Sequence, residues 1–162
     1  SYREEGEKLD LVVNEKQQAY RYNISYKINQ SWDIDSRVEF SQYQHGEQPK
    51  EFGYLVYQDV SFKSLGSPFS FSLRYALFDT DSYDSRIYAY ENSVLYAFAI
   101  PAYNGRGTRF YLSTKYHISR GIDLWVRYAQ TYYTDRNVIG SSKDQIIGNT
   151  KSEVIAQLRF KF

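Results

Sequence analysis

Apolar and polar residues alternate along most of the chain, from about residue 20 onward. Within residues 69–77, for example, an aromatic or leucine side chain occupies every second position, with serine, arginine or alanine between. A period of two puts alternate side chains on opposite faces of a β-strand, and the i, i+3, i+4 spacing of an amphipathic helix is absent. A weaker strand near residues 9–13 would bring the total to about eight. The main strands are predicted at residues 20–29, 32–43, 52–63, 69–78, 109–118, 122–133 and 152–162.

Charged residues almost never fall on the apolar face of these predicted strands, whereas the other face carries both signs. Burying one unpaired charge is costly, so in a narrow interior we expect these side chains to pair with opposite charges. In a wide interior they would line water and bias which solutes pass. The candidates for such a polar interior are Arg21, Arg37, Glu39, Arg74, Lys115, Arg127 and Arg159.

The connections between the predicted strands differ in length. Short connections are predicted at residues 29–32, 64–68 and 119–121, and long ones at residues 44–51, 79–108 and 134–151. If residues 79–108 form one excursion, all short connections fall on one side and all long ones on the other, as in outer-membrane barrels. We expect this excursion to lie mainly beyond the membrane on the long-loop side, or to fold back over the lumen. Its sequence allows a hairpin from residues 87–90 and 94–98; if those strands entered the barrel, the one-sided pattern would be lost.

The composition agrees better with membrane-spanning strands than with membrane-spanning helices. Mean hydropathy is −0.63, yet 19% of the 162 residues are aromatic and 18 are tyrosines. No stretch approaches the roughly 18 apolar residues of a transmembrane helix, whereas a transmembrane strand needs about 9–11 residues with only alternate ones apolar. Tyrosine suits the membrane–water interfaces, where a ring with a polar tip is favoured.

Alternation alone does not tell which face points outward, and a soluble ligand-carrying barrel would put the apolar face inside. Three features favour the membrane: aromatic residues near strand ends, one-sided loop lengths and an aromatic last strand. That strand places Leu158, Phe160 and Phe162 on one face, which resembles the insertion signal read by the outer-membrane assembly machinery. We therefore predict an all-β fold: an antiparallel transmembrane β-barrel of about eight strands in the bacterial outer membrane, with lipid against its apolar face.

Charge and missing residue types exclude several classes of function. The formal net charge is +1, with 20 basic and 19 acidic residues, so the chain lacks the basic excess of a nucleic-acid-binding module. Cysteine is absent, which excludes disulfides, thiolate metal sites and cysteine nucleophiles. Methionine is absent too, and we interpret residues 1–162 as one barrel segment, the processed C-terminal part of a longer precursor.

Five stretches of the sequence resemble a known family. They are GYLVYQD at residues 53–59, YALFDTDSYDSRIYAYEN at 75–92, VLYAF at 94–98, PAYNGRG at 101–107 and WVRYAQ at 125–130. They are similar to the C-terminal end of large outer-membrane proteins that carry N-terminal helix-hairpin-helix repeats, over roughly residues 20–162. The resemblance implies a long precursor in a Gram-negative envelope, with many more strands before Ser1.

The same resemblance bears on partners. About eight strands of a larger barrel would leave open edges, which lipid does not tolerate. The implied partners are therefore the remaining strands of the precursor or other envelope proteins. This segment contains no helix-hairpin-helix repeat, so the resemblance assigns it no nucleic-acid binding.

The long excursion carries the candidates for a lid over the lumen. These are Asp79, Asp81, Asp84, Arg86 and Arg106. The acidic run suggests calcium, but an EF-hand loop would need glycine and glutamate where Asp84 and Tyr90 stand. An irregular cation site remains an alternative to a solvated turn or to pairing with Arg86. The GRG run at residues 105–107 lacks the context of a phosphate-binding loop and is interpreted as a turn.

Two histidines are the candidates for catalysis. His45 lies in a long connection, and His117 lies on the polar face four residues after Ser113. On a strand that spacing separates the two side chains by about 13 Å, too far for a nucleophile–base hydrogen bond. A luminal hydrogen-bonding histidine is therefore favoured, and no catalytic residue, metal site or cofactor is predicted.

The sequence as a whole predicts a non-enzymatic integral outer-membrane barrel segment. Its role is either part of a pore or transport channel, or the anchor of a larger envelope complex. The alternatives are a membrane-embedded hydrolase that uses His117 or His45, and a soluble ligand-carrying barrel. A histidine that reaches both a serine and a carboxylate would favour the hydrolase, and an apolar interior would favour the carrier.

Overall fold

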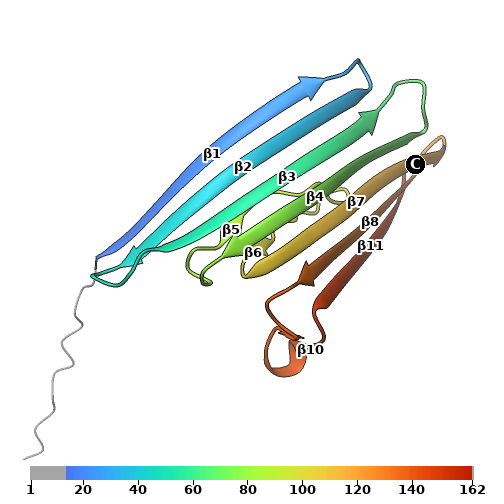
Figure 1. Cartoon of the computed structure of the whole chain (residues 1–162). Helices are drawn as coiled ribbons and strands as arrows, with labels where there is room; N and C mark the ends of the chain where they lie inside the picture. Colours follow the sequence, from blue (N-terminus) through green and yellow to red (C-terminus); the bar gives the residue numbers. More distant parts are fainter. Residues whose placement is uncertain (1–13, 162) are drawn as a thin grey trace, which may run out of the picture.

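A computed structural model describes residues 14–161 as an all-β chain built around one antiparallel sheet. The seven strands of this sheet lie side by side in the order in which they occur in the sequence (Figure 1). Their bounds are β1 (Glu15–Lys27), β2 (Trp32–His45), β3 (Glu51–Lys63), β4 (Phe69–Thr80), β7 (Arg106–Ser119), β8 (Ile122–Tyr133) and β11 (Thr150–Phe160). Within the described residues, no helix is long and apolar enough to cross a membrane.

The main predicted strands are confirmed, and most of their ends lie within a few residues of the predicted positions. The strand predicted at residues 122–133 has the bounds of β8, whereas β1 begins at Glu15 rather than at Tyr20. β4 pairs directly with β7, so the excursion between them contributes no strand to this sheet. The weak strand predicted near residues 9–13 lies outside the described residues.

The sheet is open, which corrects the predicted barrel of about eight strands to an open sheet of seven. Within residues 14–161, β1 pairs only with β2 and β11 pairs only with β8, so each has one free edge. Successive strands alternate in direction, and with seven strands β1 and β11 run the same way. These two edges therefore cannot close the sheet with an antiparallel pair.

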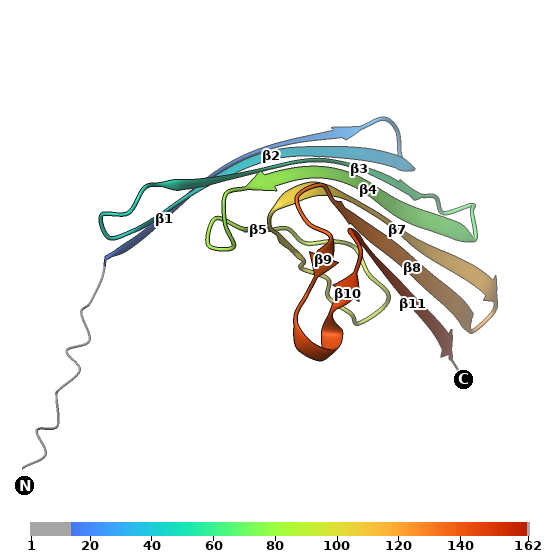
Figure 2. The same ribbon diagram turned by 60° about the horizontal axis from the view of Figure 1, so that its bottom comes forward.

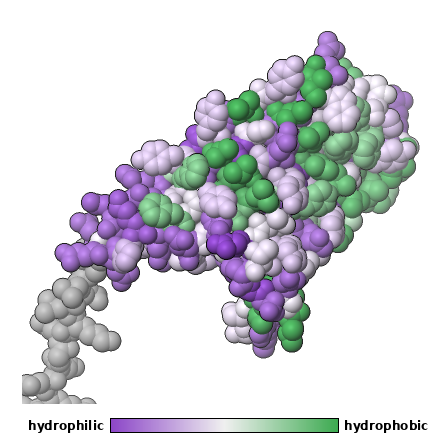
Figure 3. All heavy atoms as spheres, viewed as in Figure 1, coloured by the Kyte–Doolittle hydropathy of each residue, from purple (hydrophilic) through white to green (hydrophobic). Residues whose placement is uncertain are grey.

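The sheet has one apolar and one polar face, as the alternation predicts. One row of register partners across the apolar face is Ile34, Val60, Leu73, Leu112, Tyr128 and Val154. On this face, here called the outer face, the charged residues of the seven strands are Lys16, Asp79 and Arg106, all next to the long connections. Figure 3 shows hydrophobic residues gathered toward the opposite end of the strands, where the short turns lie.

Short and long connections lie at opposite ends of the strands, as predicted (Figure 2). We call these ends the short-turn rim and the long-loop rim. The tightest turn, residues 120–121, joins β7 to β8 at the short-turn rim. Gly121 has a φ of +88° there, a conformation that glycine adopts without a steric penalty.

Residues 81–105, here called the covering segment, fold back across the polar face of the sheet (Figure 2). They contain the two-residue strands β5 (Ile87–Tyr88) and β6 (Ala102–Tyr103), which pair with each other. The prediction that the excursion stays out of the sheet is confirmed, but the predicted hairpin is wrong in its second strand. Residues 94–98 do not form a strand, because Tyr96 has a φ of +62°, which interrupts an extended chain.

A second small hairpin lies in the connection between β8 and β11. It comprises β9 (Val138–Ile139), the 3-10 helix η1 (Ser142–Asp144) and β10 (Ile146–Ile147). The buried apolar core lies where this hairpin and the covering segment meet the sheet. Its residues are Leu55, Tyr57, Ala76, Phe78, Ile87, Ala89, Tyr103, Tyr133 and Ile139.

Candidate functional site

Glu91 is the centre of a buried ion-pair network between the covering segment and the sheet. Its side chain is fully buried, and its carboxylate accepts hydrogen bonds from Arg109, Arg127 and Tyr103. Arg109 reaches both carboxylate oxygens, Nε to Oε1 at 2.7 Å and Nη2 to Oε2 at 2.9 Å, and Tyr103 donates to Oε1 at 2.8 Å. Two guanidinium groups and a phenol therefore offset the cost of burying this carboxylate.

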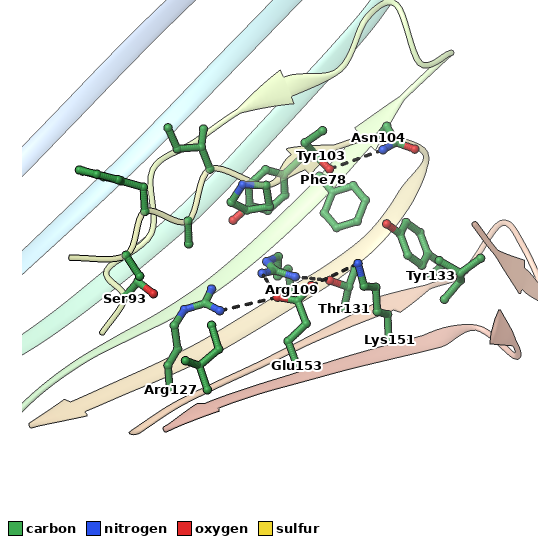
Figure 4. A pocket seen from close by; sticks show the side chains of 18 of the residues that line it. Phe78, Ser93, Tyr103, Asn104, Arg109, Arg127, Thr131, Tyr133, Lys151 and Glu153 are labelled. Carbon is green, nitrogen blue, oxygen red and sulfur yellow. Dashed lines mark hydrogen bonds and ion pairs between the residues drawn. The ribbon is translucent and has the colours of Figure 1, made fainter. Parts of the chain in front are cut away.

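The strands place Arg127 near the middle of the polar face and Arg109 closer to the long-loop rim. Arg109 in β7 and Arg127 in β8 point under the covering segment because their neighbours along each strand point to the outer face. Glu153 of β11 lies 3.4 Å from Arg109 Nη2 and 3.6 Å from Arg127 Nη1, and Lys151 Nζ lies 3.3 Å from Glu153. Arg109 Nη1 also donates to Thr131 Oγ1 at 2.7 Å. Figure 4 shows these side chains converging on one another beneath the covering segment.

A second ion pair ties the covering segment to the centre of the sheet. Arg74 of β4 donates through Nε and Nη2 to the two carboxylate oxygens of Asp59, each at 2.6 Å. Its Nη1 donates to the Tyr90 carbonyl at 2.8 Å, and its guanidinium carbon lies 3.5 Å from the ring centre of Tyr57. Paired, stacked and almost fully buried, this side chain is held in one geometry.

Tyr103 supplies both a polar and an apolar contact from β6. Burial, reinforced by the neighbouring Glu91 carboxylate, raises the pKa of the Tyr103 hydroxyl well above its usual range. The hydroxyl therefore remains a hydrogen-bond donor at neutral pH. The ring packs edge-on against Phe78 of β4, with centroids 5.5 Å apart, so one side chain joins β6 to the sheet through its ring and to Glu91 through its hydroxyl.

The covering segment approaches the sheet closely at Gly53 in β3. A Cβ atom built there would lie 2.5 Å from the Ser85 carbonyl oxygen and 2.6 Å from Ser41 Oγ. The Ser41 hydroxyl donates a hydrogen bond to the same carbonyl. Glycine at this position therefore allows the backbone of the covering segment to lie directly on the sheet.

Two of the open hollows on the polar face meet at the covering segment. One of about 550 Å³ lies between the covering segment and strands β7, β8 and β11, with Arg109 and Arg127 in its lining. The other, of about 520 Å³, lies toward the short-turn rim and is lined by serines together with Lys115 and His117. Ser93 of the covering segment lines both hollows, so this segment divides a polar space into two parts.

The predicted luminal residues all lie on the polar face, and each has a polar partner. Each interacts with a side chain on an adjacent strand, and Arg127, which lies 3.6 Å from Glu153 of β11, also pairs with Glu91 of the covering segment. The adjacent-strand partners are Arg21–Glu39 at 2.8 Å, Arg37–Asn23 at 2.6 Å, Arg74–Asp59 at 2.6 Å, Lys115–Asp123 at 4.0 Å and Arg159–Asp123. Charges on this face are therefore compensated by neighbouring strands and, at Arg109 and Arg127, by Glu91 of the covering segment.

The predicted lid residues do not form one site. Asp79 and Arg106 belong to β4 and β7 and pair at 2.6 Å on the outer face, at the long-loop rim. The Asp81 carboxylate accepts a hydrogen bond of 2.8 Å from the backbone N–H of Phe52 in β3, and the Asp84 carboxylate lies 3.6 Å from the Arg86 guanidinium. In the described part of the chain, no group of three or more His, Cys, Asp or Glu side chains is placed to hold a metal ion. The carboxylates considered for a cation are dispersed among separate partners.

Two of the three residues of the predicted assembly signal can be placed. Leu158 and Phe160 lie on the outer face of β11, opposite Leu124 and Ile122 of β8. Both are about half exposed, so they offer an apolar surface to whatever surrounds the sheet. Phe162 lies outside the described residues.

The histidines do not assemble a hydrolase triad. His117 Nδ1 lies 2.8 Å from Asp123 Oδ1, which is half of such a triad. Within residues 14–161, however, neither ring nitrogen of His117 hydrogen-bonds to a serine, and Asp123 also accepts from Arg159. His45 lies on the exposed end of β2, 3.3 Å from Glu15. These contacts do not meet the condition of a histidine that reaches both a serine and a carboxylate.

Sequence reasoning missed Glu91, the residue that organises the network. It lies in a long connection without a regular pattern, so nothing local marks it as the partner of strand residues. One signal was present: basic residues exceed acidic ones among the predicted luminal candidates. Strand carboxylates such as Asp59 and Asp123 pair with several of these basic residues, however, so the excess does not single out Glu91.

Comparison with protein-family models, with curated proteins and with solved structures gave no match. The resemblance to outer-membrane proteins with helix-hairpin-helix repeats therefore stays a prediction. What supports a function is the geometry: an exposed apolar face, a charged covered face and one-sided loops.

Proposed function

We propose that this chain forms part of the wall of a bacterial outer-membrane β-barrel, with its outer face against lipid. The observation that carries the proposal is the outer face itself. Apart from the positions at the long-loop rim, none of the seven strands places a charged side chain there. A lipid-facing surface needs such a charge-free band, about 25 Å tall and bordered by aromatic residues.

Aromatic residues on the outer face support the same placement. Near the short-turn rim, Trp32 lies against Phe62 and Phe71, with ring centroids 4.9 Å and 5.7 Å away. Toward the long-loop rim, Tyr20 and Phe40 are 65% and 54% exposed. In lipid these rings would form the two interfacial girdles, whereas in water so large an apolar surface would promote aggregation.

The covered face supports a lumen that is occupied rather than open. Tyr90 and Asn92 dock the covering segment at mid-height of the strands through Arg74 and Arg127, and Glu91 docks it through Arg109 closer to the long-loop rim. In the proposed barrel this segment acts as a plug, and the hollows beside it are water-accessible space. The proposed role is a non-enzymatic pore component or structural anchor in the envelope. A soluble carrier would instead line its interior with apolar side chains.

This proposal predicts that the cost of one charge depends on its depth along a strand. Leu112 and Thr108 both lie partly exposed on the outer face of β7, Leu112 in the middle and Thr108 near the long-loop rim. In lipid, Leu112→Arg should lower the free energy of unfolding by about 2–4 kcal/mol and Thr108→Arg by about 0–1 kcal/mol. The measurement is urea unfolding in lipid bilayers, with Leu112→Gln as the control for lost packing.

A second readout is the fraction of each variant recovered in the outer membrane of a Gram-negative host. We expect Leu112→Arg to reduce this fraction and Thr108→Arg to leave it near the unmodified level. Equal effects of the two arginine substitutions, or a protein found outside the membrane, would contradict the proposal.

A further inference from the structure

The covering segment carries an exposed apolar run beside the ion-pair network. Residues 97–102 have the sequence AFAIPA, and all six line the hollow of about 550 Å³ next to β7, β8 and β11. Phe98 is 85% exposed and Ile100 is 57% exposed. Ile155 of β11 lines the same hollow and is 39% exposed. Docking of the segment does not account for these side chains, because large apolar groups open to water on a polar face are unfavourable.

The charges around this hollow do not cancel. Its lining and the Glu91 carboxylate beneath it bring together three cations, Arg109, Arg127 and Lys151, and two anions, Glu91 and Glu153, which leaves one positive charge. The Glu153 carboxylate is shared by all three cations, at 3.4 Å, 3.6 Å and 3.3 Å respectively. The network therefore has the charge to hold one further anion.

Arg127 has a donor that can meet such an anion. Its Nε donates to the Asn92 carbonyl and its Nη2 to Glu91. Its Nη1 lies 3.6 Å from Glu153, beyond hydrogen-bond range, and donates to no other group of residues 14–161. The side chain is almost wholly buried and lines the hollow, so an acceptor there would relieve an unpaired buried donor. Lys151, about half exposed in the same lining, offers further N–H donors.

We propose that this hollow binds a small amphipathic carboxylate. Its charged group meets Arg127 and Lys151, and its apolar tail lies on Phe98, Ile100 and Ile155. One negative charge balances the network, and a carboxylate accepts hydrogen bonds from a guanidinium and an ammonium together. The volume of about 550 Å³ lies within the range of small-molecule pockets, about 300–1,000 Å³. This inference rests on the proposed function, in which the hollow is part of the lumen, and it names the class of solute held there.

The test uses the purified protein in lipid bilayers and a photoreactive probe, decanoate with a diazirine in its alkyl chain. After illumination, mass spectrometry maps the labelled residues. We expect label on residues 97–102 and on Ile155, and we expect excess octanoate to suppress it. Octanol, which has the tail without the charge, should suppress it far less. Probe dissolved in the lipid should also label the outer face, and octanoate should leave that label unchanged.

Substitutions separate the two halves of the site. Phe98→Gln should raise the octanoate concentration that halves the labelling by about tenfold, because the tail loses an aromatic contact. Lys151→Gln should raise it several-fold. The matched controls are Tyr96→Gln, in the same segment and 86% exposed but outside the lining, and Lys143→Gln on the exposed η1. Both controls should behave like the unmodified protein.

The inference and the proposed function can fail separately in this experiment. A hollow without label, equal competition by octanol and octanoate, or equal effects of the controls and the site substitutions would overturn the inference. Absence of label from the outer face would instead overturn the proposed function, and with it the luminal setting of the hollow.

Discussion

Single residues decide how the covering segment is held. Glu91 neutralises Arg109 and Arg127 at once, and its side chain is wholly buried. Removing one partner of a buried ion pair leaves the other charge uncompensated and costs about 3–5 kcal/mol. We therefore expect Glu91→Gln, which keeps the shape of the side chain, to lower the free energy of unfolding by an amount in this range.

The matched control is Asp84→Asn, in the same covering segment. Asp84 is 58% exposed and pairs with Arg86 in solvent, so its loss should leave stability almost unchanged. Urea unfolding of the reconstituted protein, followed by tryptophan fluorescence, measures both variants. A loss for Glu91→Gln no larger than that for Asp84→Asn would show that the network does not anchor the segment.

Among the elements, the covering segment depends on the one close approach at Gly53. A Cβ atom there would collide with the Ser85 carbonyl, so Gly53→Ala should lift the segment from the sheet. The expected result is several-fold faster trypsin cleavage after Arg86. Gly66→Ala is the control, because a Cβ atom at Gly66 meets no atom within 4 Å. Equal cleavage rates in both variants would contradict the close packing.

The strands were predictable from the sequence because their signal is local. A period of two over ten or so residues needs no knowledge of neighbours, and β8 was placed with its observed bounds. The hairpin of the covering segment was not predictable in the same way. Its second strand, β6, has only two residues. It is held by the packing of Tyr103 against Phe78 of β4, a tertiary contact that leaves no periodic signal in the sequence.

The candidate site was predictable only in part, for the same reason. Arg74 and Arg127 were identified because strand alternation assigns them to the polar face. Glu91 and Glu153 were missed as partners of Arg127 because each lies more than 25 positions from it in the sequence. Closure of the sheet was also beyond the sequence pattern, since alternation defines faces but not the number of strands.

At the scale of the whole molecule, the covering segment buries the central part of the charged face, whereas the apolar face is exposed. The covering segment and the network around Glu91 account for the charged face. The apolar face has no cover within the described residues, and we propose that lipid covers it. This placement is the central claim, because the proposed plug depends on it.

The two tryptophans test this claim most directly, since they lie on opposite faces of the sheet. Trp32 lies on the outer face with Phe62 and Phe71, whereas Trp125 is on the polar face and only 8% exposed. The measurement is fluorescence quenching by lipids brominated near the headgroup end of their chains, in the Trp32→Phe and Trp125→Phe variants. We predict that Trp32→Phe removes the lipid-quenched emission and that Trp125→Phe retains it. If the quenching is lost in the Trp125→Phe variant instead, or is unaffected by either substitution, the result would contradict a lipid-facing outer face.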